Sequence, residues 1–502
     1  MSNTFMNTLV NETNFMTTEN GALAHKSTLS MVYDMFAFGG AYRKRTDEDC
    51  ILLFKNAYEE NPKLALRCLF YLRDARGGQG ERRFFRVCFK WLCENYEDVA
   101  VRMLIHLSEY GRWDDLIYAT YGTDVFVAAL AIIKNQLMLD LECKTPSLLG
   151  KWLPSENASA YSTKVAAGEV RKYLGLTHKQ YRKMLSTLRG RINIVEKLMS
   201  ENRWDEIEFD KLPSKAGLIY KNAFARRDII AKKYEVFAKD KTTKVNADTL
   251  YPYEVVEKAL KYIRWDGVIS GAATEVERAM IEKYWENLPD YLNGNSCSMM
   301  CVVDTSGSMC GRPINVAISL GMYCAERIGG PFKDHYISFS SRPQLIKVEG
   351  VDFIDKVARI YATNLCENTN IEATFDLLLK VAKKSNVEDV PKTIVIISDM
   401  QIDAMTGSMW MRDMSVKRWT EETAATEMEL IRKKWAAAGL ECPRLVYWNV
   451  DARDNTILDA GPNVSFVSGC SPVLYEQIVR GVTGVDLMLE KLNSERYAAI
   501  TL

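Results

Sequence analysis

The chain has 502 residues, of which 47% are hydrophobic and 26% are charged, and its 65 Lys and Arg balance 65 Asp and Glu. This composition is typical of a globular protein and excludes disorder as the main state. A chain of this length exceeds what one hydrophobic core usually supports, so we expect two or more domains. The longest apolar run, Val125 to Ile133, is about half as long as a membrane crossing requires and ends at Lys134. The N-terminus is polar and does not resemble a secretory signal, so we expect a cytoplasmic protein with no membrane partner.

The cysteines and histidines argue against two common kinds of site. Twelve cysteines are scattered without a CxxC pair, and the four histidines lie far apart in the sequence. We therefore expect buried thiols in a reducing compartment rather than disulfides. A zinc site and a histidine-based acid–base enzyme have little support, whereas sites built from oxygen ligands stay open.

From about residue 29 to 290 the pattern is helical, because apolar residues recur at i, i+3 and i+4. Many short amphipathic helices in succession have to stack on one another, so residues 1–290 are predicted to form an all-helical module, HEAT-like or a curved bundle. No repeat of fixed period is present. The clearest predicted helices are residues 50–61, 62–74, 81–94, 97–110, 179–199 and 253–264.

The pattern changes after residue 292, where short apolar runs of β type alternate with helical segments. This alternation predicts a doubly wound parallel sheet in residues 291–502, with its site at the carboxyl ends of the strands. Strands are expected at residues 297–303, 335–339, 393–397, 444–450 and 464–467. Helices are expected near residues 314–327, 371–383 and 421–438.

A basic stretch lies inside the helical half. Residues 164–197 contain nine Lys and Arg against Glu169 and Glu196. Such a stretch is able to neutralise phosphates, although it also fits the solvated face of a helix. Tyr181 among these cations adds the mixture of aromatic and basic residues that single-strand binders use. The candidate RNA-binding residues are Lys172, Lys179, Arg182, Lys183, Arg189 and Arg191, together with Arg73 and Arg76 from an earlier turn.

The sharpest motif follows the first predicted strand of the second half. Asp304, Ser306 and Ser308 form a DxSxS pattern on a strand-to-helix turn, with Gly307 between the serines. One carboxylate and two hydroxyls that project toward one point are oxygen ligands of the kind that Mg²⁺ prefers. An ordinary polar turn is the alternative.

This motif resembles the metal-ion-dependent adhesion site of the von Willebrand factor A fold. The resemblance implies a von Willebrand A-like domain and two further ligands. It assigns Thr369, in the loop before a helix, and Asp399, at the end of the strand at residues 393–397. The implied cofactor is Mg²⁺ or another divalent cation such as Mn²⁺, with an open position for an acidic group of a partner.

Three segments of the helical half carry a second resemblance. They are the HKST run at residues 25–28, YLRDARGGQGER at residues 71–82 and YGRWDDL at residues 110–116. They resemble an uncharacterised family of viral, bacterial and plant proteins that joins such helices to an A domain. Its plan is similar to that of the Ro autoantigens, whose TROVE module and A domain bind small noncoding and misfolded RNAs. In the residues themselves, we expect Gly77 and Gly78 to end a helix in a left-handed conformation and Trp113 to lie in the core.

These observations favour a Ro-like RNA-binding protein with a metal-dependent A domain. The alternative is a scaffold whose metal captures an acidic side chain of another protein, without RNA. A third hypothesis is a metal-dependent enzyme. The chain contains no HExxH, GxSxG or P-loop motif, so we expect a protein that is not an enzyme and has no catalytic residues.

Overall fold

The structure is a computed structural model, and its residues group into two compact units. The first unit contains the residues up to Thr46, Lys55–Ala65 and Leu250–Ser494, and the second contains Asp47–Phe54, Leu66–Thr249 and Glu495–Leu502. This division differs from the predicted boundary at residue 291. The structure describes residues 10, 13–192, 194–264, 266–271, 273–339, 342–363, 370–402, 426–459, 461 and 463–502.

The first unit is built on a six-stranded sheet of order β5-β4-β3-β6-β7-β8. All neighbours are parallel except β4 and β5, which are antiparallel. Because the next strand along the chain, β4, lies on one side of β3 while β6 lies on the other, the strand order reverses at β3, where α/β sheets place their ligands. The strands are β3 (Met299–Asp304), β4 (His335–Phe339), β5 (Gln344–Lys347), β6 (Thr393–Ser398), β7 (Arg444–Asn449) and β8 (Val464–Ser468).

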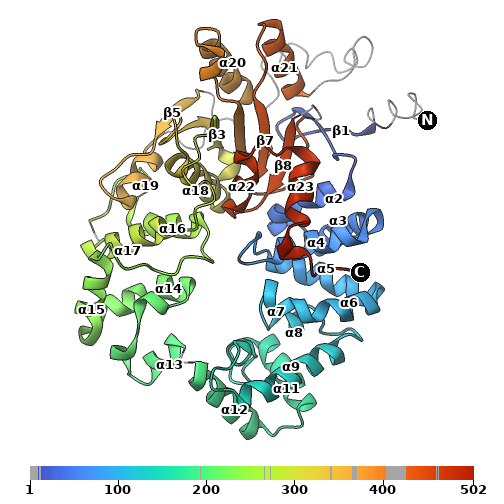
Figure 1. Cartoon of the computed structure of the whole chain (residues 1–502), viewed down its shortest axis with the longest axis vertical. Coiled ribbons are helices and arrows are strands. Elements are labelled where there is room, and N and C mark those ends of the chain that lie inside the picture. The colour runs from blue at the N-terminus through green and yellow to red at the C-terminus, as the bar shows by residue number, and fades with distance from the viewer. Residues whose placement is uncertain are drawn as a thin grey trace. The chain divides into compact units, whose positions relative to one another are not determined.

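The five strands predicted for the second half are confirmed, and β5 is the one that the sequence missed. The side chains of β6 are buried at every position, as expected of a strand covered on both faces. In contrast, three of the four residues of β5 are exposed, so this edge strand has no apolar run to detect. The C-terminal half is therefore a mixed, mostly parallel sheet with helices around it (Figure 1).

One glycine brings a helix close to the central strand. Helix α18 (Arg312–Arg327) packs against β3, β4 and β6. A Cβ added at Gly321 would lie 2.5 Å from Cγ2 of Val303, so a larger residue would push the helix off the sheet. The other helices of the first unit are α2 (Met31–Phe38), α16 (Pro252–Ala259), α17 (Glu275–Glu286), α19 (Phe353–Tyr361), α20 (Ile371–Ala382), α21 (Glu427–Ala437), α22 (Tyr475–Val479) and α23 (Gly484–Leu492).

The N-terminal segment corrects the expectation of an all-helical first half. Strands β1 (Phe15–Thr17) and β2 (Leu23–His25) form an antiparallel pair. The backbone N–H of His25 donates to Ile457 O at 2.7 Å, and Ile457 N–H donates back to His25 O at 2.9 Å. The segment is therefore bonded to the chain between β7 and β8, through backbone bonds that span more than 400 residues and leave no local sequence signal.

The second unit consists of short helices in succession (Figure 1). The predicted helix at residues 179–199 is two helices, and the one at residues 97–110 is interrupted by a 3-10 turn. None of the helices in the described ranges combines the length and apolarity that a membrane crossing requires. Helices α3 (Asp47–Glu60) and α4 (Pro62–Arg73) contribute to both units. The rest of the second unit contains α5 (Arg82–Asn95), α6 (Glu97–Met103), α7 (Leu107–Tyr110), α8 (Asp115–Tyr118), α9 (Phe126–Glu142), α10 (Leu149–Trp152), α11 (Tyr161–Tyr173), α12 (His178–Ile192), α13 (Val195–Ser200), α14 (Ser214–Arg226) and α15 (Asp228–Lys239).

Candidate functional site

The turn after β3 brings together the DxSxS residues. The backbone N–H of Ser306 donates to Asp304 Oδ1 at 2.9 Å, and the hydroxyls of Ser306 and Ser308 lie 3.0 Å apart. Asp304 and Ser306 are buried, whereas Gly307 between the serines is exposed. The turn thus gathers a carboxylate and two hydroxyls within a few ångströms, as the sequence predicts.

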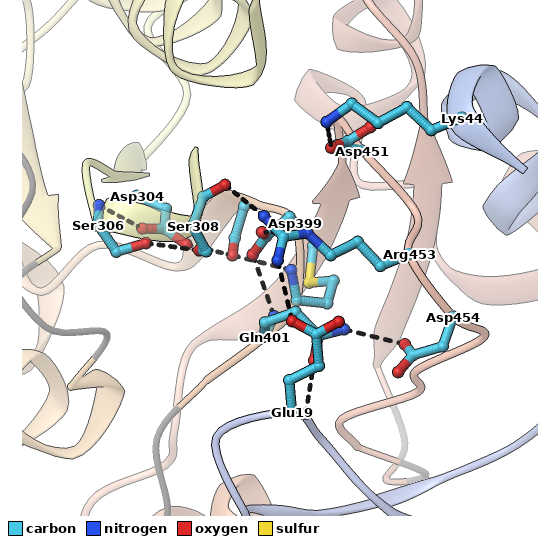
Figure 2. Close-up of polar contacts among 12 residues, drawn as sticks. Glu19, Lys44, Asp304, Ser306, Ser308, Asp399, Gln401, Asp451, Arg453 and Asp454 are labelled. Carbon is cyan, nitrogen blue, oxygen red and sulfur yellow. Dashed lines mark hydrogen bonds and ion pairs between the residues drawn. The ribbon is translucent and has the colours of Figure 1, made fainter. Parts of the chain in front are cut away.

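The neighbouring strand β6 supplies the second carboxylate. Because Val303 pairs with Ile397, the residues that follow each strand come out side by side. The hydroxyl of Ser398 donates to Asp304 Oδ2 at 2.5 Å, and Gln401 N–H donates to Asp399 Oδ1 at 3.2 Å. Figure 2 shows Asp399 beside Asp304 and Ser308. Four of the five predicted ligands therefore share one edge of the sheet, at the point where its strand order reverses.

The two carboxylates at this edge of the sheet both have raised pKa values. Burial, and then the charge of Asp399, raise the pKa of Asp304 to about 7, against hydrogen bonds from Ser398 and Ser306. Burial also raises the pKa of Asp399, although the Gln401 N–H, the Arg453 charge and the Ser308 hydroxyl oppose it. Buried carboxylates with raised pKa values are stabilised by a cation held between them.

The donor set fits a divalent cation. Asp399 Oδ2 is buried and accepts no hydrogen bond in the described part of the chain, which leaves it able to bind an ion. Within the described ranges, no three His, Cys, Asp or Glu side chains gather as a metal cluster, so the hydroxyls of Ser306 and Ser308 would have to complete the set. The fifth predicted ligand, Thr369, lies outside the described residues.

The predicted RNA-binding residues differ in their burial and in their partners. The prediction that Arg73 contacts phosphate is wrong, because this residue is 3% exposed and its Nη2 lies 2.6 Å from Asp115 Oδ2. Arg189 is half-buried, and it donates to Gly150 O and Leu153 O, both at 2.9 Å. These two guanidiniums hold the fold together and are not available to a ligand.

The remaining predicted cations are exposed, with different surroundings. Arg76 donates to Glu109 O at 3.0 Å, Lys172 pairs with Glu169 at 2.8 Å, and Arg191 donates to Leu141 O at 2.6 Å. Three exposed cations lie in the first two turns of α12, where Arg182 donates to the carbonyl of His178 in its own helix. These three residues are Lys179, Arg182 and Lys183.

The glycine-rich and GRWDDL segments meet in a buried ionic network of the second unit. Asp115 accepts from Arg73, from Arg86 Nε at 2.7 Å and from Arg112 N–H at 3.0 Å. A Cβ at Gly111 would lie 2.3 Å from Asp115 Oδ2, so only glycine fits there. Both segments are therefore needed by the fold itself.

Two smaller expectations in these segments are corrected, and the HKST run has a structural role. The left-handed glycine is Gly80, with φ of 66°, rather than Gly77 or Gly78. Trp113 is half-buried rather than fully in the core. The threonine of the HKST run, Thr28, caps a turn by donating its hydroxyl and its N–H to the buried carboxylate of Asp34.

The sequence missed a third set of residues around the candidate metal site. Arg453 lies in the loop after β7, with its Nε 3.6 Å from Asp399 Oδ2 and its Nη2 donating to Ser308 O at 2.5 Å. Its Nη1 donates to Glu19 Oε2 at 2.9 Å. Glu19 and Arg453 are 434 residues apart in the chain, so no spacing rule could have paired them.

These features define a protein with a helical N-terminal region and a C-terminal α/β sheet, with a carboxylate–hydroxyl site where the strand order reverses. The chain belongs to the family described as "Domain of unknown function (DUF2828)", which matches residues 18–117 and 143–296, just over half of its length. The family described as "Domain of unknown function (DUF7788)" matches residues 297–493.

A relative and a solved structure are similar over most of the chain. "Uncharacterized protein L728" of Acanthamoeba polyphaga mimivirus is 27% identical over 478 residues, which cover 87% of this chain and 79% of the relative. The crystal structure of the Deinococcus radiodurans RO (RSR) protein is similar with a TM-score of 0.34 and 11% identity. That similarity covers 93% of this chain and 99% of the other.

Proposed function

We propose that the α/β unit binds one divalent cation, Mg²⁺ or Mn²⁺, and uses it to capture an anionic group of a partner. Asp304 and Asp399 would hold the cation with the hydroxyls of Ser306 and Ser308, and Thr369 would join them by its resemblance to the adhesion-site pattern. The observation that carries this proposal is the pair of buried carboxylates that meet at the reversal of strand order. Once bound, the cation supplies electrostatic attraction for an oxygen ligand.

Binding is favoured over catalysis by the composition of the site. Metal-dependent hydrolases hold their metals with several carboxylates or histidines and activate water between them. Among the described residues, no third Asp, Glu, His or Cys side chain joins Asp304 and Asp399 in a set that could hold a metal, so serine hydroxyls would make up the rest of the set. A cation held by few charged ligands attracts an acidic group strongly. We therefore propose a binding role, with a protein that offers an acidic side chain as the partner.

The test is metal binding by variants of the turn. Asp304→Ala and Ser306→Ala should weaken Mn²⁺ binding, with the carboxylate variant losing at least about 100-fold, since even residues that only support metal ligands cost 10–100-fold. Isothermal titration measures the affinity, and circular dichroism checks that the fold is intact. Ser385→Ala, an exposed serine at the end of a helix, is the matched control and should bind as the wild type does. Equal binding by all four proteins would refute the proposed site.

RNA binding by the helical unit is a second candidate, and the observation that favours it is the charge of α12. This helix carries five Lys and Arg and no acidic residue. Lys179, Arg182 and Lys183 are exposed near its start, on a helix that buries Tyr181, Leu185 and Leu188 on its other side. A contiguous set of cations is the minimum that phosphate neutralisation requires.

The RNA candidate predicts a charge-reversal effect confined to α12. Arg182→Glu with Lys183→Glu should reduce the affinity for a single-stranded RNA probe by at least about tenfold at low salt, and the wild-type affinity should fall steeply as salt rises. Lys383→Glu with Lys384→Glu, an exposed adjacent pair in the first unit, is the matched control. Arg189 is left unchanged because its loss would damage the fold. Salt-insensitive binding, or equal loss in both double variants, would count against this candidate.

A further inference from the structure

Arg453 joins three parts of the first unit at the metal site. Its guanidinium lies against Asp399, a candidate ligand, and donates to the carbonyl of Ser308, in the turn that carries two others. It also pairs with Glu19 of the N-terminal segment (Figure 2). A permanent positive charge therefore lies 3.6 Å from a carboxylate that the proposed cation would share.

Backbone and amide contacts fix the N-terminal segment beside this arginine. Glu19 N–H donates to Gln401 Oε1 at 2.8 Å, and Asn20 Nδ2 donates to Gln401 O at 2.8 Å. The hydroxyl of Thr18 donates to Ile402 O at 2.9 Å. The Glu19 backbone is thus held without its carboxylate, so this side chain is able to leave Arg453 while the segment stays in place.

The Glu19–Arg453 pair is suited to exchange. The side chains of Glu19 and Arg453 are 53% and 31% exposed, and an ion pair in contact with solvent contributes little to stability. A guanidinium binds any carboxylate or phosphate group in the same planar geometry, with two parallel hydrogen bonds where both oxygens are free. Another oxyanion can therefore replace Glu19 at small cost.

A cation at Asp399 would change the electrostatic forces on the guanidinium of Arg453. A doubly charged ion beside the guanidinium repels it, whereas an oxyanion bound to that ion would attract it. We propose that Arg453 is the anion-binding residue of this site. Glu19 occupies its guanidinium until an oxyanion, a carboxylate or a phosphate group, binds the cation and replaces Glu19. This inference rests on the proposed cation site and adds to it the residue that selects an anion and the internal carboxylate that competes with it.

The proposal predicts effects of opposite sign on two ligands. Arg453→Gln removes a positive charge near the cation, so it should tighten binding of Mg²⁺ alone by about tenfold and weaken binding of an anion to the Mg²⁺-loaded protein by a similar factor. Glu19→Gln removes the competing negative charge, so it should weaken binding of Mg²⁺ alone and tighten binding of the anion. Arg453→Lys keeps the charge and should bind Mg²⁺ as the wild type does. A purely structural role would weaken both ligands together.

Isothermal titration of the full chain tests this with Mg²⁺ alone, and then with acetate and with inorganic phosphate at saturating Mg²⁺. A stronger effect of Arg453→Gln on acetate indicates a carboxylate ligand, and a stronger effect on phosphate indicates a phosphate group. Arg359→Gln removes an exposed arginine paired with Asp355 and is the control, expected to change neither ligand. Wild-type Mg²⁺ binding with unchanged affinities in the Arg453 and Glu19 variants would overturn this inference alone. Absence of Mg²⁺ binding in every protein would overturn the proposed function and the inference with it.

Discussion

Asp115→Ala is expected to lower the free energy of unfolding of the helical unit by about 3–5 kcal/mol, because it leaves buried charges without their partner. The carboxylate is fully buried and accepts from Arg73, Arg86 and the backbone of Arg112. Burial alone would raise its pKa, but the charges of Arg73 and Arg86 hold the pKa below its usual value. Asp115 therefore stays ionised at neutral pH, and its removal leaves Arg73 uncompensated in the interior.

A second Arg–Asp pair of the same unit provides the control. Arg83 and Asp47 also form an ion pair, but their side chains are 44% and 57% exposed. Asp47→Ala should therefore cost less than about 1 kcal/mol. Denaturant unfolding, monitored by hydrogen exchange in α5 and α8, measures the free energy of unfolding of both variants. The double variant Asp115→Ala with Arg73→Met should be less damaged than the sum of its parts. Similar losses of unfolding free energy in Asp47→Ala and Asp115→Ala would show that burial of the network does not determine its contribution to stability.

The sequence predicted those parts of the fold that depend on local pattern. The central strands β3 and β6 are apolar runs buried on both faces, and such runs need no knowledge of their partners. The β1–β2 pair and the edge strand β5 were missed. These strands are short and partly exposed, and the β1–β2 segment is bonded to a distant part of the chain. Helix breaks within residues 97–110 and 179–199 depend on packing, which periodicity does not encode.

The same distinction holds for the site. Asp304, Ser306 and Ser308 lie on one turn, so their spacing was enough, and Asp399 came from the resemblance to a known pattern. Arg453 and Glu19 could not be found this way, because the contact joins the loop after β7 to a segment before the first helix. Arg73 was misjudged for a related reason. A conspicuous arginine beside glycines fits a phosphate contact, and only the fold shows that Asp115 already neutralises it.

The metal-free protein should lose stability as the pH rises from about 4 to 7, at up to about 1.4 kcal/mol per pH unit from Asp304. Burial and the charge of Asp399 raise the pKa of Asp304 to about 7 in the folded protein, against about 4 in an unfolded chain. Between these values the folded state holds a proton that the unfolded state has released. The stabilisation is therefore complete below about pH 4 and is lost as the pH rises through about 7.

Asp399→Asn removes both the titration of Asp399 itself and its charge beside Asp304, while the other groups are retained in both proteins. Without the charge of Asp399, the pKa of Asp304 should fall. The loss of stability should therefore occur over a narrower pH range. Arg453 and Asp451 also face Asp399, and they are retained in both proteins. Urea unfolding in the presence of a chelator, at half-unit steps of pH, measures the difference. Saturating Mg²⁺ should restore wild-type stability at pH 8 and should not restore it in Asp399→Asn, because cation binding requires both carboxylates ionised. Parallel pH profiles for the two chelated proteins would show that Asp304 and Asp399 do not interact in the way that the proposed cation site requires.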